Sequence, residues 1–325
     1  MMFGRQLRLP EPAEYGSVVL SGTDVSVRRG GDDILHGVDI DVRAGEVVGI
    51  LGPNGVGKST LLGALSGDLT YRGAITVSGR EVGAWGGRAL ALRRAVLRQS
   101  NPLSFPFPVL DVVKMGRAPW RGMLDPDINN RIVAEELVRT DTMRFIERVF
   151  TSLSGGERAR VALARAMAQR AGILLLDEPS AALDINYQEQ VLALARWYAR
   201  RGNAVVIVLH DLAAAAAYTD RILLLQDGRS RAFGTPEEVL TAELLSEVYE
   251  HPIRVSREPD GELIVLPVRF ADEGPRHGAE SPGAESLRHD SGSPTDAGPP
   301  RNSGSPADPG PLSPSVPHSN QEVSP

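Results

Sequence analysis

The sequence contains no cysteine, which excludes both a disulfide framework and a thiolate metal site. Its formal net charge of −6 argues against a general nucleic-acid binder, because such proteins usually carry a basic surface. Long apolar runs are also lacking: Ile173–Leu176 and Ala204–Leu209 fall far short of the ~20 residues that cross a bilayer. Residues 1–16 have no apolar core of signal-peptide length. We therefore expect a soluble chain in which the apolar runs are buried strands and helices.

A glycine-rich segment that ends in Lys58 and Ser59 is the most informative feature that the sequence does contain. A strand-like segment (Glu46–Leu51) precedes it and a helix-like one (Leu61–Leu65) follows, which is the context of a phosphate-binding loop. Glycines let successive N–H groups point at a polyphosphate, and the helix N-terminus adds its positive dipole end. Lys58 can then reach the β- and γ-phosphates, and the Ser59 hydroxyl can ligate Mg²⁺. The predicted loop consists of Gly52, Pro53, Asn54, Gly55, Val56, Gly57, Lys58, Ser59 and Thr60.

Before this loop, short strand-like runs alternate with polar turns, which favours an antiparallel sheet. The runs are Ser17–Leu20, Asp24–Val27 and Val38–Val42. After the loop, apolar residues recur at helical spacing between Val109 and Val149, and we predict an inserted helical lobe at about 109–150.

Further along, apolar strands alternate with helices. Ile173–Leu176 and Ala204–Leu209 are continuous apolar runs that the helix-like segment Tyr187–Arg200 connects. This order is typical of a parallel sheet covered on both faces. Near the end of the fold, Ile253–Val255 and Leu263–Leu266 flank a Pro-Asp-Gly turn, which predicts a hairpin.

The two ends of the chain differ from the rest in composition. Residues 271–325 are rich in Gly, Pro, Ser and Ala and have almost no large apolar residue, so they cannot offset the entropy cost of ordering. We predict a disordered tail there, and we favour a dispensable tail over a recruitment segment. One main domain is expected at 17–270, after an N-terminal extension at 1–16.

Acidic residues follow the first of the two apolar strands, and a histidine follows the second. Asp177 and Glu178 lie at the strand end where a doubly wound sheet binds ligands. Asp177 would hold Mg²⁺, directly or through water, and Glu178 would orient and polarise the attacking water. Two adjacent carboxylates could instead cap the next helix. His210 could contact a γ-phosphate, although a lone histidine is more often structural.

A second Ser/Gly turn opens a helix at Leu153-Ser154-Gly155-Gly156-Glu157 and is therefore a second anion site. One γ-phosphate does not need two such sites from a single subunit. The economical interpretation is that this segment, called the signature loop below, serves the nucleotide of another copy of the chain.

Together these features resemble the ATP-binding subunits of ABC transporters over about residues 18–266, with the motifs in the family's order. The resemblance implies an α/β fold with a P-loop NTPase (RecA-like) core, an N-terminal antiparallel β subdomain and an inserted helical subdomain. In the family's terms the motifs are Walker A (Gly52–Thr60), the Q-loop residue Gln99, the LSGGQ-type motif (Leu153–Glu157), Walker B (Ile173–Asp177), the catalytic glutamate Glu178, the D-loop (Ala181–Asp184) and the switch histidine His210.

The resemblance also implies a head-to-tail homodimer that closes over two ATP molecules. Glu178, His210 and Gln99 would be catalytic, and Ser59, Gln99 and Asp177 would hold Mg²⁺. The residues that would contact the partner's ATP are Leu153, Ser154, Gly155, Gly156, Glu157 and Asp184. The other expected partners are a two-copy membrane permease and a substrate-binding protein, with no nucleic acid. They would place the chain at the cytoplasmic face of the cell membrane.

Three positions depart from the family pattern. Glu157 stands where Gln is commoner, and Ser180 stands where Thr is usual, which keeps the hydroxyl. The aromatic residue that normally stacks on adenine is missing, and Arg28-Arg29 stands in its place. We hypothesise that Arg29, or Arg28, stacks its guanidinium on the base and so binds ATP.

Finer features indicate one branch of the family. Arg94–Ser100, Phe105–Val109 and Met115–Pro119 resemble the ATPases of importers for iron chelates, haem and vitamin B12, and residues 237–255 are most similar to the haem subgroup. Importers of ferric siderophores or vitamin B12 stay open as alternatives. An ATPase that acts on DNA or ribosomes is the alternative from another class. The short separation of Lys58 from Ser154 and the single cassette oppose it.

Overall fold

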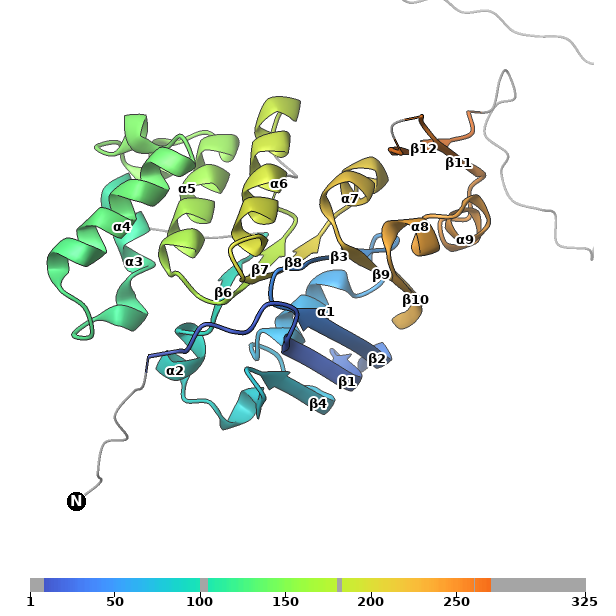
Figure 1. Ribbon diagram of the computed structural model, residues 1–325, viewed down its shortest axis with the longest axis horizontal. Helices are drawn as coiled ribbons and strands as arrows, with labels where there is room; N and C mark the ends of the chain where they lie inside the picture. Colours follow the sequence, from blue (N-terminus) through green and yellow to red (C-terminus); the bar gives the residue numbers. More distant parts are fainter. Residues whose placement is uncertain (1–8, 100–104, 180–182, 260, 270–325) are drawn as a thin grey trace, which may run out of the picture. The chain divides into compact units, whose positions relative to one another are not determined.

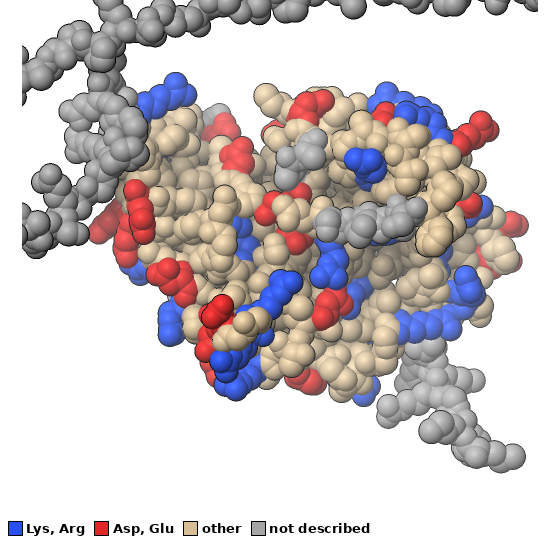
Figure 2. Space-filling view, turned by 180° about the vertical axis from the view of Figure 1, so that it is seen from behind, with Lys and Arg blue, Asp and Glu red and all other residues tan. Residues whose placement is uncertain are grey.

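The computed structural model describes residues 9–99, 105–179, 183–259 and 261–269. Figure 1 shows how their helices and strands are arranged. The predicted tail at 271–325, residues 1–8 of the N-terminal extension, Ser180 and the D-loop residues Ala181 and Ala182 lie outside the described residues. None of the helices in the described part combines the length and the apolar character that a membrane span requires. On the face shown in Figure 2, basic and acidic side chains of the described part are interspersed.

The N-terminal part forms a four-stranded sheet in the order β2-β1-β4-β5. Its strands are β1 (Val18–Arg29), β2 (Asp32–Arg43), β4 (Arg72–Val77) and β5 (Arg80–Glu81), and all of its pairs are antiparallel. β1 and β2 form one long hairpin whose turn residues, Gly30 and Gly31, both have positive φ, as a tight hairpin turn requires. The predicted antiparallel β part is confirmed.

β1 is one strand where the sequence predicts two runs, Ser17–Leu20 and Asp24–Val27. The cause is Asp24, which has a φ of 51° and lies where the register of β1 and β2 shifts between Gly22 and Val25. The N–H of Asp24 donates to a carboxylate oxygen of Asp39 on β2 at 2.8 Å. This irregularity breaks the alternation of buried and exposed residues, so the sequence pattern splits the strand in two.

The main sheet has six strands in the order β10-β9-β3-β8-β7-β6. They are β3 (Val47–Leu51), β6 (Arg94–Leu97), β7 (Ile173–Asp177), β8 (Ala204–Val208), β9 (Arg221–Gln226) and β10 (Arg229–Gly234). All of them pair in parallel except the edge strand β10, which is antiparallel to β9. The predicted parallel sheet is confirmed, and it brings the carboxyl ends of β3, β6, β7 and β8 to one edge.

Both faces of this sheet are covered (Figure 1). α5 (Gly155–Ala168), α6 (Ile185–Ala199) and α7 (Leu212–Tyr218) lie on one face, and α1 (Lys58–Leu65) lies on the other, toward the antiparallel sheet. Alternate residues of β7 enter different cores: Leu174 and Leu176 pack with α5 and α6, whereas Ile173 and Leu175 pack with α1. A strand with two buried faces therefore has a continuous apolar sequence.

The helical lobe contains α3 (Val109–Met115), α4 (Pro126–Arg139) and one side of α5. Val112, Leu137 and Val161 are buried in its own core. The opposite side of α5, with Leu163 and Met167, belongs to the core of the main sheet. The lobe core thus extends beyond residue 150 into α5, which joins the lobe to the sheet.

The remaining elements are short. The hairpin of β11 (Ile253–Arg257) and β12 (Leu263–Pro267) confirms the predicted one. The others are α2 (Gly87–Ala91), α8 (Pro236–Val239), α9 (Ala242–Val248) and the 3-10 turns η1 (Val82–Ala84), η2 (Ala118–Trp120), η3 (Met143–Phe145) and η4 (Phe150–Ser152).

Candidate nucleotide site

The predicted phosphate loop lies between β3 and α1, in the middle of the carboxyl edge of the main sheet. Backbone geometry fixes its glycines, since φ is +142° at Gly52, +82° at Gly55 and +104° at Gly57. A Cβ atom at Gly52 would lie 2.4 Å from the carbonyl oxygen of Leu225. A Cβ at Gly57 would lie 2.7 Å from Cδ2 of Leu35. Larger side chains are excluded there, and the predicted strand–loop–helix context is confirmed.

Lys58 points into the loop that precedes it. Its side chain is buried, and Nζ donates hydrogen bonds to the carbonyl oxygens of Gly52 at 2.7 Å and Pro53 at 2.9 Å. Burial lowers the pKa of the Lys58 ammonium, while the carboxylates of Glu178 and Asp177 act in the opposite direction. The loop therefore holds a positive charge at its centre, where a polyphosphate would be received.

Ser59 and Asp177 meet across the gap between the phosphate loop and β7. The Ser59 hydroxyl donates to Oδ1 of Asp177 at 2.8 Å. Asp177 is buried, and this burial raises the pKa of its carboxyl against the effect of the Ser59 hydrogen bond. A hydroxyl and a carboxylate side by side offer the hard oxygen ligands that Mg²⁺ prefers, so the residues present fit this ion.

Three predicted catalytic residues converge at the ends of three neighbouring strands. Nε2 of Gln99, after β6, donates to Oε2 of Glu178 at 2.7 Å. Nε2 of His210, after β8, lies 2.5 Å from Oε1 of the same carboxylate. Glu178 follows β7 with a φ of 49°, an uncommon backbone conformation for a residue with a side chain. Its carboxylate is therefore held between an amide and an imidazole beside Asp177.

The alternative role of Asp177 and Glu178 as a helix cap is excluded. The next helix, α6, is capped by Asp184, whose carboxylate accepts a hydrogen bond from the N–H of Tyr187 at 3.1 Å. Asp184, at the end of the D-loop, therefore serves as the N-cap of α6.

The signature loop lies at the start of α5. Ser154 caps α5, and within the described residues of one subunit the signature loop is not hydrogen-bonded to the phosphate loop. Gly155 lines a cavity of ≈ 350 Å³ that Gln99, Asp177 and Glu178 also line.

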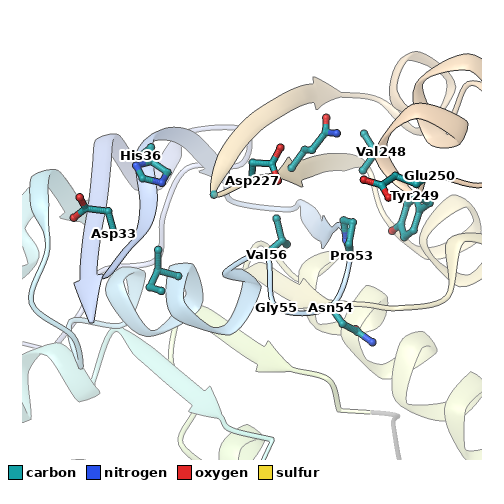
Figure 3. A pocket seen from close by; sticks show the side chains of 13 residues that line it. Asp33, His36, Pro53, Asn54, Gly55, Val56, Asp227, Val248, Tyr249 and Glu250 are labelled. Atoms are coloured by element: carbon teal, nitrogen blue, oxygen red, sulfur yellow. The ribbon is translucent and has the colours of Figure 1, made fainter. Parts of the chain in front are cut away.

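Figure 3 shows a cavity of ≈ 510 Å³ beside the phosphate loop. Asn54, Gly55 and Val56 line one side of it, and Ile34 lines another. Tyr249, which directly follows α9, also lines this cavity, although it comes almost two hundred residues after the phosphate loop in the sequence. The Tyr249 hydroxyl is buried.

The sequence does not predict this wall of the cavity. Ile34 belongs to none of the motifs, and Tyr249 lies in the segment 237–255, which indicates a subgroup of the family and not a nucleotide contact. Nor does the cavity settle the base-stacking hypothesis, since neither Arg28 nor Arg29 lines it. Arg28 is engaged in the β1–β2 turn: its Nε donates to the carbonyl oxygen of Gly31 at 2.9 Å. Arg29 is exposed and pairs in register with Asp32.

Comparison with known proteins agrees with this geometry. The pattern of the family described as ABC transporter matches residues 35–181. A protein of Streptomyces coelicolor named hemin import ATP-binding protein HmuV is 56% identical over 262 residues, which are 80% of this chain and 94% of the relative. A protein of the same name from Pseudomonas aeruginosa is 47% identical, over 73% of this chain and 94% of the relative.

Solved structures of the same kind superpose on the chain. An inward-facing ABC transporter assigned to the metal-chelate type matches with a TM-score of 0.66 and 27% identity, over 78% of this chain and 98% of that one. A dimeric ATP-binding cassette in a post-hydrolysis state, bound to ADP and phosphate, matches with a TM-score of 0.61 and 26% identity, over 67% and 98%. The chain therefore belongs to the ABC transporter family, as one of its ATP-binding, ATP-hydrolysing subunits.

Proposed function

We propose that this chain hydrolyses ATP to energise an importer of haem. The observation that carries the proposal is the convergence of Gln99, Glu178 and His210 at the strand ends next to the phosphate loop. It puts a carboxylate able to activate water beside a site able to hold a triphosphate. The choice of haem is supported by relatives named hemin import ATP-binding proteins in several bacteria, at 40–56% identity.

Within one subunit, the proposed roles follow from the contacts. Lys58 exchanges its bonds to the Gly52 and Pro53 carbonyls for bonds to the β- and γ-phosphates. Ser59 and Asp177, with Gln99, would hold Mg²⁺, which would neutralise charge on the phosphate oxygens. Glu178 orients and polarises the attacking water, and His210 fixes the Glu178 carboxylate and contacts the γ-phosphate.

Between subunits, we propose that two copies pack head to tail and enclose two ATP molecules. The signature loop and Asp184 of one copy then complete the site of the other. The dimeric cassette among the structural neighbours supports this arrangement. So does the position of Ser154, which caps α5 and whose hydroxyl makes no hydrogen bond to the phosphate loop within the described residues of one chain. ATP binding would close the dimer and hydrolysis would reopen it, which is a ligand-linked two-state switch.

The remaining partners in this proposal are a two-copy permease, which would hold the chain at the cytoplasmic face of the membrane, and a substrate-binding protein. The helical lobe would transmit the movement of the dimer to the permease. Importers of ferric siderophores or vitamin B12 are the alternatives within the family. The mixture of charges in Figure 2 gives no support to an ATPase that acts on DNA or ribosomes.

The test is haem uptake by membrane vesicles that hold the full chain with its permease. We expect MgATP to drive haem uptake. Glu178→Gln should stop it and lower ATP hydrolysis by about 100-fold or more, while ATP binding persists because the Lys58 loop is intact. Glu247→Gln, in an exposed ion pair with Arg231, is the matched control and should leave both rates unchanged. Normal hydrolysis by Glu178→Gln would contradict its role, and uptake of vitamin B12 or a ferric siderophore in place of haem would contradict the cargo.

A further inference from the structure

Two chain segments meet beside the helical lobe. One consists of residues 105–108, which precede α3 and follow the Q-loop in the sequence, and the other leads into the signature loop. Pro108 and Val149 pair as an isolated antiparallel bridge between them. Next to this bridge, the N–H of Val109 donates to the carbonyl oxygen of Arg148 at 2.9 Å. The backbone of Arg148 is therefore hydrogen-bonded at the end of the segment that follows the Q-loop, where α3 begins.

The side chain of Arg148 reaches the signature loop. Nη1 donates to Oε1 of Glu157 at 3.1 Å, and Nη2 donates to the carbonyl oxygen of Ser152 at 3.2 Å. The other carboxylate oxygen of Glu157 accepts a hydrogen bond from the N–H of Ser154 at 2.8 Å. Arg148 thus bonds both to Ser152, which directly precedes the signature loop, and to Glu157 at the end of that loop.

The Ser154 hydroxyl is arranged so that it can still donate. Its oxygen accepts a hydrogen bond from the N–H of Glu157 at 3.2 Å, which completes a capping box at the start of α5. A hydroxyl that accepts a bond keeps its own proton free for another acceptor. Ser154 can therefore donate to a phosphate oxygen without leaving the cap.

The same capping box puts a negative charge next to the proposed phosphate site. The Ser154 N–H and the Arg148 guanidinium both lower the pKa of Glu157, so Glu157 is a carboxylate at neutral pH. A carboxylate repels an approaching triphosphate unless a cation balances it. Within the described residues, Arg148 is the only Lys or Arg that forms an ion pair with Glu157. The neighbouring Arg144 and Arg160 form their ion pairs with Asp141. The Glu157 carboxylate acts on Arg144 only as a minor electrostatic influence.

We propose that Arg148 is a positioning residue for the ATP bound to the opposite copy. It neutralises Glu157 and keeps the signature loop in register with the segment that follows the Q-loop. A chain with the commoner Gln at position 157 would need no such cation, so Arg148 compensates for this departure from the family pattern. The inference rests on the proposed action of the signature loop on the partner's nucleotide.

The first measurement is ATP-dependent dimerisation of the full chain, by sedimentation, in the Glu178→Gln background. Arg148→Ala should weaken this dimerisation about five- to tenfold, mainly because the Glu157 charge beside the proposed phosphate site is then left without its ion pair. Binding of a fluorescent ATP analogue to the monomer should not change, since Arg148 does not contact the Lys58 loop. Arg231→Ala, which removes an exposed ion pair on β10, is the matched control and should dimerise normally.

Rescue by a second substitution separates charge from packing. Glu157→Gln keeps the capping box, because a Gln side chain accepts the same N–H bond, but it removes the charge. The double variant Arg148→Ala/Glu157→Gln should therefore dimerise within about twofold of Glu157→Gln alone. A double variant as weak as Arg148→Ala would overturn the inference, and so would an Arg148→Ala protein with unchanged dimerisation.

Ser154→Ala in the same assay distinguishes this inference from the proposed function. If Ser154→Ala dimerises normally, the signature loop does not act on a partner's nucleotide and the proposed arrangement fails. If Ser154→Ala dimerises weakly and Arg148→Ala does not, the proposed arrangement stands and only the role of Arg148 is overturned.

Discussion

At the scale of single residues, Lys58 and Asp177 are buried although burial disfavours their charged forms. Each is held by local hydrogen bonds, Lys58 by two carbonyl oxygens and Asp177 by the Ser59 hydroxyl. Such groups cost stability in the nucleotide-free chain and are useful only when a polyphosphate and its cation arrive. The site therefore predicts a trade-off between stability and activity.

Asp177→Asn tests this trade-off. The folded-state pKa of Asp177 is raised above its ordinary value of 3.8, so the carboxylate lowers the free energy of unfolding at neutral pH. Without nucleotide, the variant should gain about 1 kcal/mol of stability, since Asn still accepts the Ser59 bond. The gain should shrink as the pH falls through the raised pKa, where the parent protonates. Thermal melting at several pH values measures it.

The control for this variant is Glu247→Gln, which makes the same change from carboxylate to amide in an exposed ion pair with Arg231. Its melting temperature should match that of the parent. ATP hydrolysis dependent on Mg²⁺ should be lost in Asp177→Asn alone. An Asp177→Asn protein that melts below the parent at neutral pH would show that the charge is stabilising.

Much of the candidate site could be predicted from the sequence at this scale, because phosphate-loop chemistry requires particular residue types at fixed spacing. Gly52, Gly57 and Lys58 are examples, and the structure gives each a geometric reason. The cavity wall at Ile34 and Tyr249 could not be predicted, because it forms only when segments far apart in the chain come together.

At the scale of elements, α5 connects the lobe to the main sheet, and α3 packs closely against it. Gly116 ends α3 with an ordinary helical φ, yet a Cβ there would lie 2.2 Å from the carbonyl oxygen of Arg165 on α5. The absence of a side chain thus sets how closely the two helices approach. This close approach has no sequence signal, because an isolated glycine also fits a simple helix end.

Gly116→Ala should destabilise the chain by about 1–3 kcal/mol, because α3 and α5 must move apart to make room. Chemical denaturation measures the loss. Gly87→Ala is the matched control: Gly87 is the first residue of α2, and a Cβ there meets nothing within 4 Å. That variant should be neutral or slightly stabilising. If the Gly116→Ala protein and the parent had the same free energy of unfolding, α3 and α5 could move apart without loss of stability, and the prediction would be wrong.

The same limit on prediction applies to strands. The parallel strands β7 and β8 are recognisable because two buried faces require a continuous apolar run. β1 is not recognisable as one strand, because Asp24 interrupts its alternation, and the edge strand β10 is largely polar and gives no apolar signal.

At the scale of the whole molecule, the sequence predicts the α/β class, the antiparallel part, the inserted helices and the order of motifs. The redundancy of two anion sites also predicts that the signature loop serves another copy, but the contacts that the signature loop and the phosphate loop make depend on tertiary packing, which the sequence pattern does not contain. Within one subunit the described residues leave these two loops without a hydrogen bond between them. In the proposed dimer, the signature loop of the second copy contacts the nucleotide that the phosphate loop of the first copy binds.

The most direct test of this arrangement uses the absence of native cysteine. One copy carries Asn54→Cys and another carries Ser152→Cys, at an exposed position just before the signature loop, both in the Glu178→Gln background, and a short bismaleimide is added with or without MgATP. The account predicts a covalent dimer that needs both variants and MgATP. A chain carrying both cysteines that links only within itself, or a dimer that forms equally without nucleotide, would contradict it.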